Sequence, residues 1–199
     1  MKSLYLVEGN NDCKFLSRAL IQNYSIDSSK IIHYPNKGIK AEKRMAESVV
    51  IRQLMNEYSP YDVLIKSEIG KQPLISLLGK VCFPTAQNYW EMKLTTVFDH
   101  DGRSPFEEFN TIFADVKRTH PQLVFELISD TPHRDIGHTV SYRIQKISGR
   151  RREDLNRIHF FCFYESLEKV IGRKFGKNVS IDDGIIRLGE HLKGRDFLP

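Results

Sequence analysis

The sequence contains few cysteines, and their spacing builds no recognisable site. Its 199 residues include only Cys13, Cys82 and Cys162, with no C-x-x-C pair. An odd number of widely separated cysteines argues against a disulfide framework and against a zinc knuckle. It is typical of proteins that work in a reducing compartment, so we expect a cytoplasmic protein.

Long apolar runs and nucleotide-binding loops are also missing. No apolar stretch approaches the roughly 20 residues of a membrane helix, and M-K-S-L-Y-L-V-E-G places Glu8 where a signal peptide would continue its apolar core. Neither the P-loop pattern G-x-x-x-x-G-K-[ST] nor the dinucleotide-binding pattern G-x-G-x-x-G occurs. These absences disfavour a membrane partner, a nucleotide-driven motor and a dinucleotide-dependent enzyme.

The composition is that of a globular chain with a mild basic excess. Apolar residues make up 40% of the sequence and charged residues 28%, and the formal net charge is +5. Such a chain can bury a sizeable core, and its charge leans toward an anionic partner such as nucleic acid. No repeat and no linker rich in proline, glycine or serine divides the chain.

Apolar strands alternate with amphipathic helices along the chain. Strands are expected at Leu4–Val7, Lys30–Tyr34, Tyr61–Ile65, Leu94–Phe98, Gln122–Ile128, Val140–Ile147 and His159–Phe163. Helices are expected at Asp12–Tyr24, Ala41–Tyr58, Lys71–Leu78, Ser104–Thr119, Tyr164–Ile171 and from Asp182 onward. We expect Val140–Ile147 to be an edge strand, Asp130–His138 and Ser148–Glu153 to be loops, and Gly79–Trp90 to be irregular. The alternation predicts an α/β fold with a mostly parallel sheet.

Acidic side chains follow two of these expected strands directly. Glu8 follows the first strand, and Asp99 and Asp101 follow Leu94–Phe98. Ligands of open α/β sheets bind beyond the carboxyl ends of the strands, so three acids there would converge if the strands are neighbours. Carboxylate oxygens suit Mg²⁺. The alternative is that each acid only caps a helix or complements its dipole.

The same residues resemble two motifs of the Toprim domain. V-E-G-N-N-D at Val7–Asp12 is similar to its E-G-x-x-D motif, and V-F-D-H-D-G at Val97–Gly102 is similar to its D-x-D motif. The resemblance implies a Toprim-like, Rossmann-like, mostly parallel sheet flanked by helices on both faces. It places the Toprim-like core at residues 1–130 and a C-terminal extension, packed on the same domain, at residues 131–199.

The resemblance also implies roles for individual residues. Glu8 would be a general acid or base, or a metal ligand, and Asp99 and Asp101 would hold Mg²⁺ or Mn²⁺ in a catalytic metal site. Asp12 would support them, or would only complement the dipole of its helix. Glu165 or Glu168, in F-Y-E-S-L-E-K-V-I, would reach the site from a late helix, or would belong to a solvated helix face.

Basic residues suggest where nucleic acid would bind. Arg103 follows the second motif, and Lys37 and Lys40 flank Gly38 after the second expected strand. Arg150, Arg151 and Arg152 form a basic run that would contact phosphates, or would be a solvated loop. These six residues are the candidates for nucleic-acid contact.

The length narrows the functions that the resemblance implies. A topoisomerase needs a gate domain and a replicative primase needs template-handling domains, which 199 residues cannot house beside this sheet. We expect Mg²⁺-dependent hydrolysis of phosphodiester bonds in DNA or RNA by a nuclease-like Toprim protein. The alternative is a non-catalytic module that binds metal and nucleic acid, or a subunit acting with a partner ATPase. A phosphatase-like enzyme is a third reading, but its D-x-D usually follows the first strand, where this chain has E-G.

Overall fold

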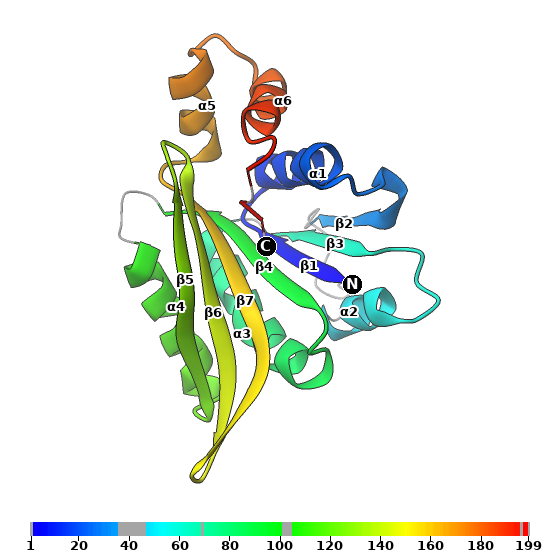
Figure 1. The fold of residues 1–199 in the computed structure, drawn as a ribbon, viewed down its shortest axis with the longest axis vertical. Coiled ribbons are helices and arrows are strands. Elements are labelled where there is room, and N and C mark those ends of the chain that lie inside the picture. Colours follow the sequence, from blue (N-terminus) through cyan, green and yellow to red (C-terminus); the bar gives the residue numbers. More distant parts are fainter. Residues whose placement is uncertain (1, 36–46, 69, 101–104, 196, 199) are drawn as a thin grey trace.

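The computed structural model is an α/β fold built on one seven-stranded sheet (Figure 1). It describes residues 2–35, 47–68, 70–100, 105–195 and 197–198. The strands are β1 Ser3–Val7, β2 Ile31–Pro35, β3 Val63–Ser67, β4 Lys93–Asp99, β5 Leu123–His133, β6 Gly137–Ser148 and β7 Arg151–Phe163. Their order in the sheet is β2-β3-β1-β4-β7-β6-β5. Neighbours from β2 to β7 pair in parallel, whereas β7, β6 and β5 form an antiparallel meander, so the sheet is mostly parallel, as expected.

Helices cover both faces of this sheet, again as expected. They are α1 Asn10–Tyr24, α2 Glu47–Met55, α3 Lys71–Asn88, α4 Pro105–Thr119, α5 Leu167–Phe175 and α6 Ile181–His191, with a short 3₁₀ turn at Ser28–Lys30. Side chains alternate along a strand, so Leu4 and Leu6 pack on the face of α2, α3 and α4. Tyr5 and Val7 pack on the opposite face, under α1, α5 and α6. Each face therefore has its own apolar core.

Two helices begin at serines that cap them. The Ser166 hydroxyl accepts a hydrogen bond from the Lys169 backbone N–H (3.4 Å), and the Ser180 hydroxyl accepts one from the Asp183 N–H (3.1 Å). Such caps satisfy N–H groups that have no partner inside the helix. The expected α5 was placed three residues early because its apolar pattern runs on from β7. The expected cap at Ser104 lies outside the described residues, as do residues 41–46 of the helix expected at Ala41–Tyr58.

The prediction of an irregular Gly79–Trp90 was wrong. Helix α3 continues through Pro84 to Asn88. Val81 and Ala86 are buried in the core, so packing outweighs the poor helix propensity of proline.

Three predictions about the antiparallel strands were also wrong. The expected loop Asp130–His138 is a hairpin, because β5 continues to His133 and β6 starts at Gly137. Pro132 is tolerated there because β5 is the edge strand, where a missing N–H breaks no ladder. The expected edge strand at Val140–Ile147 is instead interior, between β7 and β5. Residues 151–153 of the expected basic loop belong to β7.

The sheet is continuous across residue 130, where the Toprim-like core was expected to end and the C-terminal extension of the same domain to begin. Strand β5 spans that residue, and β7 from the C-terminal part pairs directly with β4. Among the described helices, none combines the length and the apolar character needed to cross a membrane.

Candidate functional site

Three neighbouring parallel strands end at the same edge of the sheet, and each end bears a carboxylate. Val7 of β1 is in register with Ser67 of β3 and with Val97 of β4. Glu8 and Glu68 follow β1 and β3 directly, and Asp99 is the last residue of β4. The equal register therefore brings these strand ends to one level, where α/β folds bind ligands.

Glu8 and Asp99 are in direct contact at this edge. The backbone N–H of Asp99 donates a hydrogen bond to Glu8 Oε2 across 3.5 Å. The Glu8 carbonyl accepts a bond from the Gly70 N–H (3.1 Å), which fixes the chain where it leaves β1. The first acids of the two sequence motifs thus come together. Asp101 and Arg103, like Lys37 and Lys40, lie outside the described residues.

Asp12 lies beside this pair, in the first turn of α1. Its side chain is 7% exposed, and a Cβ on Gly9 would lie 3.5 Å from its Oδ2. Burial raises the pKa of Asp12 to about 7, helped by the charges of Glu8 and Glu168 and opposed by a hydrogen bond from the Gly9 backbone. Asp12 therefore lies in an acidic cluster, and its position in the first turn of α1 also fits the alternative role of complementing the helix dipole.

The two glutamates of the late helix have different surroundings. Glu168, in the first turn of α5, accepts a hydrogen bond from the Asn11 amide (2.7 Å), next to Asp12. Glu165 pairs with Arg173 (3.0 Å) in a separate cavity, which His100 and Tyr164 also line. Of the two, Glu168 reaches the acidic cluster.

Glu68 and Lys71 are two residues that the sequence reading missed. Glu68 is buried and pairs with Lys66 at 2.5 Å. The sequence feature that could have identified Glu68 is V-L-I-K-S-E, in which a short apolar strand is followed by an acid, as at Glu8. The prediction ended that strand at Ile65, three residues before the acid.

Lys71 supplies positive charge at the same edge. Its Nζ lies 3.8 Å from the Glu108 carboxylate and 5.9 Å from the centre of the Phe98 ring. Phe98 is the residue that precedes Asp99 in β4. Burial raises the pKa of the Cys162 thiol, and the charges of Lys71, Glu108 and Asp99 also act on it. Lys71, paired with Glu108, and Asp99 therefore both lie close enough to Cys162 to affect its pKa.

Arg150, Arg151 and Arg152 lie far from the acidic cluster. Asp99 is in register with Phe163, and Arg151 precedes Phe163 by twelve residues on β7. At about 3.3 Å per residue the separation is about 40 Å. These arginines, at the tip of the β6–β7 hairpin (Figure 1), cannot hold the phosphate that Glu8 and Asp99 would meet.

The acidic cluster has the donor chemistry of a hard divalent cation. Its described members, Glu8, Asp12, Asp99 and Glu168, offer only carboxylate oxygens, which suit Mg²⁺ and Mn²⁺. Burial raises the pKa of Asp12, the charges of Glu8 and Glu168 add to this effect, and a nearby cation would oppose both. Within the described ranges, no three histidine, cysteine or acidic residues are already arranged as a metal site. The expected ligand Asp101 is outside those ranges.

Comparisons with protein-family models, curated proteins and solved structures found no match for this chain.

Proposed function

We propose that this chain is a Toprim-like hydrolase that uses Mg²⁺ or Mn²⁺ to cleave phosphodiester bonds in DNA or RNA. The hydrogen bond from the Asp99 backbone to the Glu8 carboxylate carries the proposal, because it joins two acid motifs 91 residues apart. Asp12 and Glu168 extend the pair into an acidic cluster, and Lys71 adds a cation nearby.

Each of these residues would have its own role in the reaction. Glu8 and Asp99, with Asp101, would hold the cation, which when bound neutralises phosphate oxygens and activates water for attack on phosphorus. Water would form the new P–O bond, the bond to the leaving oxygen would break, and that oxygen would take up a proton. Asp12 can supply or accept a proton near neutral pH, since its pKa is about 7. Lys71 would orient the phosphate.

The test is cleavage of labelled single-stranded and double-stranded DNA and RNA with Mg²⁺ or Mn²⁺. We expect Glu8→Gln and Asp99→Asn to fold normally and to lose at least about 100-fold in rate, since each removes charge from the metal site. Asp101→Asn should behave like Asp99→Asn. Glu165→Gln is the matched control, because Glu165 pairs with Arg173 outside the cluster. Equal cleavage by all variants would identify a contaminant or another site.

A non-catalytic module, or a subunit that needs a partner ATPase, is the second candidate. The position of Glu168 beside Asp12 favours hydrolysis, because it adds an acid to the cluster beyond the two motifs. Metal-dependent binding of nucleic acid without cleavage by the wild-type chain would favour the second candidate.

A further inference from the structure

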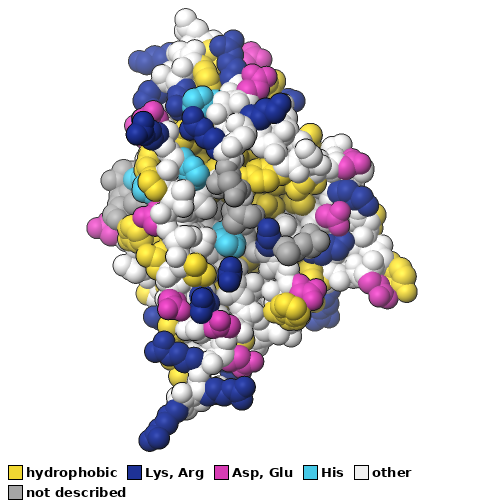
Figure 2. Space-filling view, in the orientation of Figure 1, with side chains coloured by type: hydrophobic (Ala, Val, Ile, Leu, Met, Phe, Trp, Pro, Cys, Tyr) yellow, Lys and Arg dark blue, Asp and Glu magenta, His cyan; other side chains and the backbone are white. Residues whose placement is uncertain are grey.

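One face of the sheet is partly open. Helices α1, α5 and α6 cover this face near the carboxyl ends of the parallel strands, and the strands extend beyond them (Figure 1). A groove of about 1080 Å³ lies at the opposite end of the parallel strands, lined by residues of β4, β6, β7 and the turns beside them. Figure 2 shows Lys and Arg side chains, with acids between them, from the middle of this face down to its lower tip.

Three cations of the groove form a row across neighbouring strands. Arg143 of β6 is in register with Arg157 of β7, and the pairing of Leu94 with Ile158 puts Lys93 of β4 level with Arg157. Neighbouring strands lie about 4.8 Å apart, and like charges placed side by side on a sheet are destabilising. An anion bound along the row would remove this repulsion.

Of these three cations, only Arg143 forms an ion pair with an acid among the described residues. Asp154 pairs with Arg143 at 3.4 Å and accepts a hydrogen bond from Gln145. Within the described part of the chain, Lys93 and Arg157 make no ion pair, although Glu57 and Glu91 also line the groove.

The charges of this row affect the pKa of the nearby His159. It lies two residues further along β7, and therefore on the same face as Arg157, and its Nδ1 is 2.7 Å from the Ser141 hydroxyl. Burial first, and then the charges of Lys93 and Arg157, lower the pKa of His159 to about 4. Burial and the neighbouring positive charges therefore act together to keep this imidazole neutral.

Trp90 supplies an aromatic surface in the same groove. Its side chain is 70% exposed, and it stands in the turn between α3 and β4. The Asn156 amide of β7 donates hydrogen bonds to the carbonyls of Tyr89 (3.3 Å) and Met92 (3.2 Å), on either side of Trp90 in the sequence. These bonds hold the backbone of the turn against β7. The exposed ring is therefore carried by a fixed backbone, which reduces the entropy lost when a flat ligand stacks on it.

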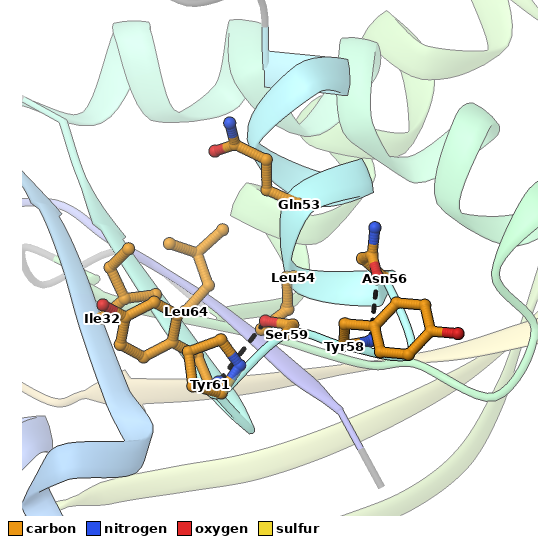
Figure 3. Close-up of a pocket in the computed structure, with 9 residues that line it drawn as sticks. Ile32, Gln53, Leu54, Asn56, Tyr58, Ser59, Tyr61 and Leu64 are labelled. Carbon is orange, nitrogen blue, oxygen red and sulfur yellow. Dashed lines mark hydrogen bonds between the residues drawn. The ribbon is translucent and has the colours of Figure 1, made fainter.

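A second exposed aromatic adjoins the groove. Tyr58 is 85% exposed and follows Asn56 and Glu57, which line the groove. Its backbone N–H donates to Asn56 Oδ1 at 2.8 Å. Together with Ile32 and Tyr61 it lines a smaller apolar cavity (Figure 3), which shares Asn56 with the groove. Trp90 therefore shares the groove with the three cations, whereas Tyr58 lies in the neighbouring cavity.

We propose that this groove binds single-stranded nucleic acid, with a base stacked on Trp90 and phosphates held by Lys93 and Arg157. A single strand fits better than a duplex because stacking on a side chain needs an unpaired base face. An acidic peptide would use the cations but not the exposed ring. The groove is separate from the acidic cluster: Arg157 precedes Phe163, the register partner of Asp99, by six residues on β7, which is about 20 Å.

The chain contains a single tryptophan, so its fluorescence reports on the groove alone. The full chain is titrated with single-stranded DNA and RNA of about 15 nucleotides, in EDTA, so that no cleavage interferes. We expect the strands to quench Trp90 fluorescence and a duplex of the same length to quench it far less. Glu8→Gln should bind as tightly as the wild type, so failure of the proposed hydrolysis would leave this result intact.

Variants separate the stacking contact from the charges, with binding followed by anisotropy of a labelled strand. Trp90→Ala should weaken binding between about fivefold and 150-fold, and Trp90→Phe should restore most of it, because a base stacks on either ring. Lys93→Gln and Arg157→Gln should each lower the slope of log affinity against log salt by about 0.7, the value for one phosphate contact of a single strand. Lys177→Gln, an exposed cation between α5 and α6, is the control and should change nothing.

Three results would overturn the proposal. Equal binding by Trp90→Ala and Trp90→Phe would show that no base stacks there. Equal affinity for heparin or an acidic peptide, with the same salt slope, would show only a general attraction for anions. Concentration-dependent dimerisation that shifts Trp90 emission, without oligonucleotide binding, would show that a second copy of the chain covers the groove.

Discussion

The backbone N–H of Asp99 reaches the carboxylate of Glu8 across 3.5 Å, although 91 residues separate them. The contact exists because β1 and β4 are adjacent parallel strands in equal register. It concentrates negative charge at one edge of the sheet, where Asp12 and Glu168 add to it. Four measurable consequences concern this cluster, the basic groove and the strand pairing between them.

We expect Mg²⁺ to raise the melting temperature of the wild-type chain at pH 8. A ligand at 100 times its Kd stabilises a folded protein by about 2.7 kcal/mol, which is a shift of about 5 to 10 °C for a chain of this size. The double variant Glu8→Gln, Asp99→Asn should lose the shift, because it removes two of the proposed ligands. Glu165→Gln should keep it. A full shift in the double variant would place the cation elsewhere. The measurement is differential scanning calorimetry with and without Mg²⁺.

Asp12→Asn should stabilise the metal-free protein more strongly at pH 8 than at pH 5. The pKa of Asp12 is raised from its ordinary value of 3.8 to about 7. The folded state therefore favours the protonated acid, and stability present below pH 4 is lost as pH rises through 7. Asparagine stays neutral and can still accept the Gly9 hydrogen bond, so the gain should be about 2 kcal/mol larger at pH 8 than at pH 5.

Urea denaturation in EDTA at the two pH values measures this gain. Asp115→Asn, an acid of α4 that pairs with Arg118, is the comparison. An equal effect of Asp12→Asn at both pH values would contradict the burial of a repelled carboxylate.

His159 should remain neutral down to about pH 4 in the free protein, because its pKa lies below the ordinary 6.5. The stability that the neutral ring contributes is present above pH 6.5 and is lost as pH falls toward 4. NMR titration of the ring measures the midpoint directly, and a midpoint near 6.5 would contradict the buried, cation-flanked position. Binding of a single strand should raise the midpoint, since phosphate offsets the charges of Lys93 and Arg157.

Gly137→Ala should destabilise the protein strongly or prevent folding. A Cβ at Gly137 would lie 2.1 Å from the Cys162 carbonyl oxygen, where β6 and β7 pair next to Phe163. Neither backbone can move without breaking strand pairing, so a loss of more than about 3 kcal/mol is expected. Gly172→Ala, in the middle of α5 with nothing within 4 Å, should instead stabilise by about 0.5 to 1 kcal/mol. Thermal melting of both variants compares them, and similar melting temperatures would contradict the close approach.

Local signals in the sequence were sufficient for the parallel part of the fold. Leu4–Val7 and Leu94–Phe98 are short apolar runs that stop at an acid or glycine, and both are strands in the structure. The apolar spacing after Asn10 gives α1 almost to the residue. The two strands are buried on both faces, so their apolar composition distinguishes them, whereas α1 is recognised by its periodic apolar face.

The antiparallel strands could not be predicted as reliably. Strand β5 contains Asp130 and Pro132, which are turn signals by composition, and only its position at the edge makes them compatible with a strand. Arg151–Asp154 are exposed in β7, so no apolar pattern marked them as part of a strand. Pairing with β6 supplies the hydrogen bonds that the local sequence does not predict.

The sequence by itself determined that Glu8 and Asp99 stand at strand ends, because a short apolar run directly before each of them marks a buried strand. Only the tertiary structure decided which acids meet. Strand order made Glu8 and Asp99 neighbours and brought Glu168 to Asp12, while pairing over the length of β7 put Arg151 about 40 Å away. The physical reason is that distance between side chains depends on strand order and register, and both are set by packing across the whole sheet.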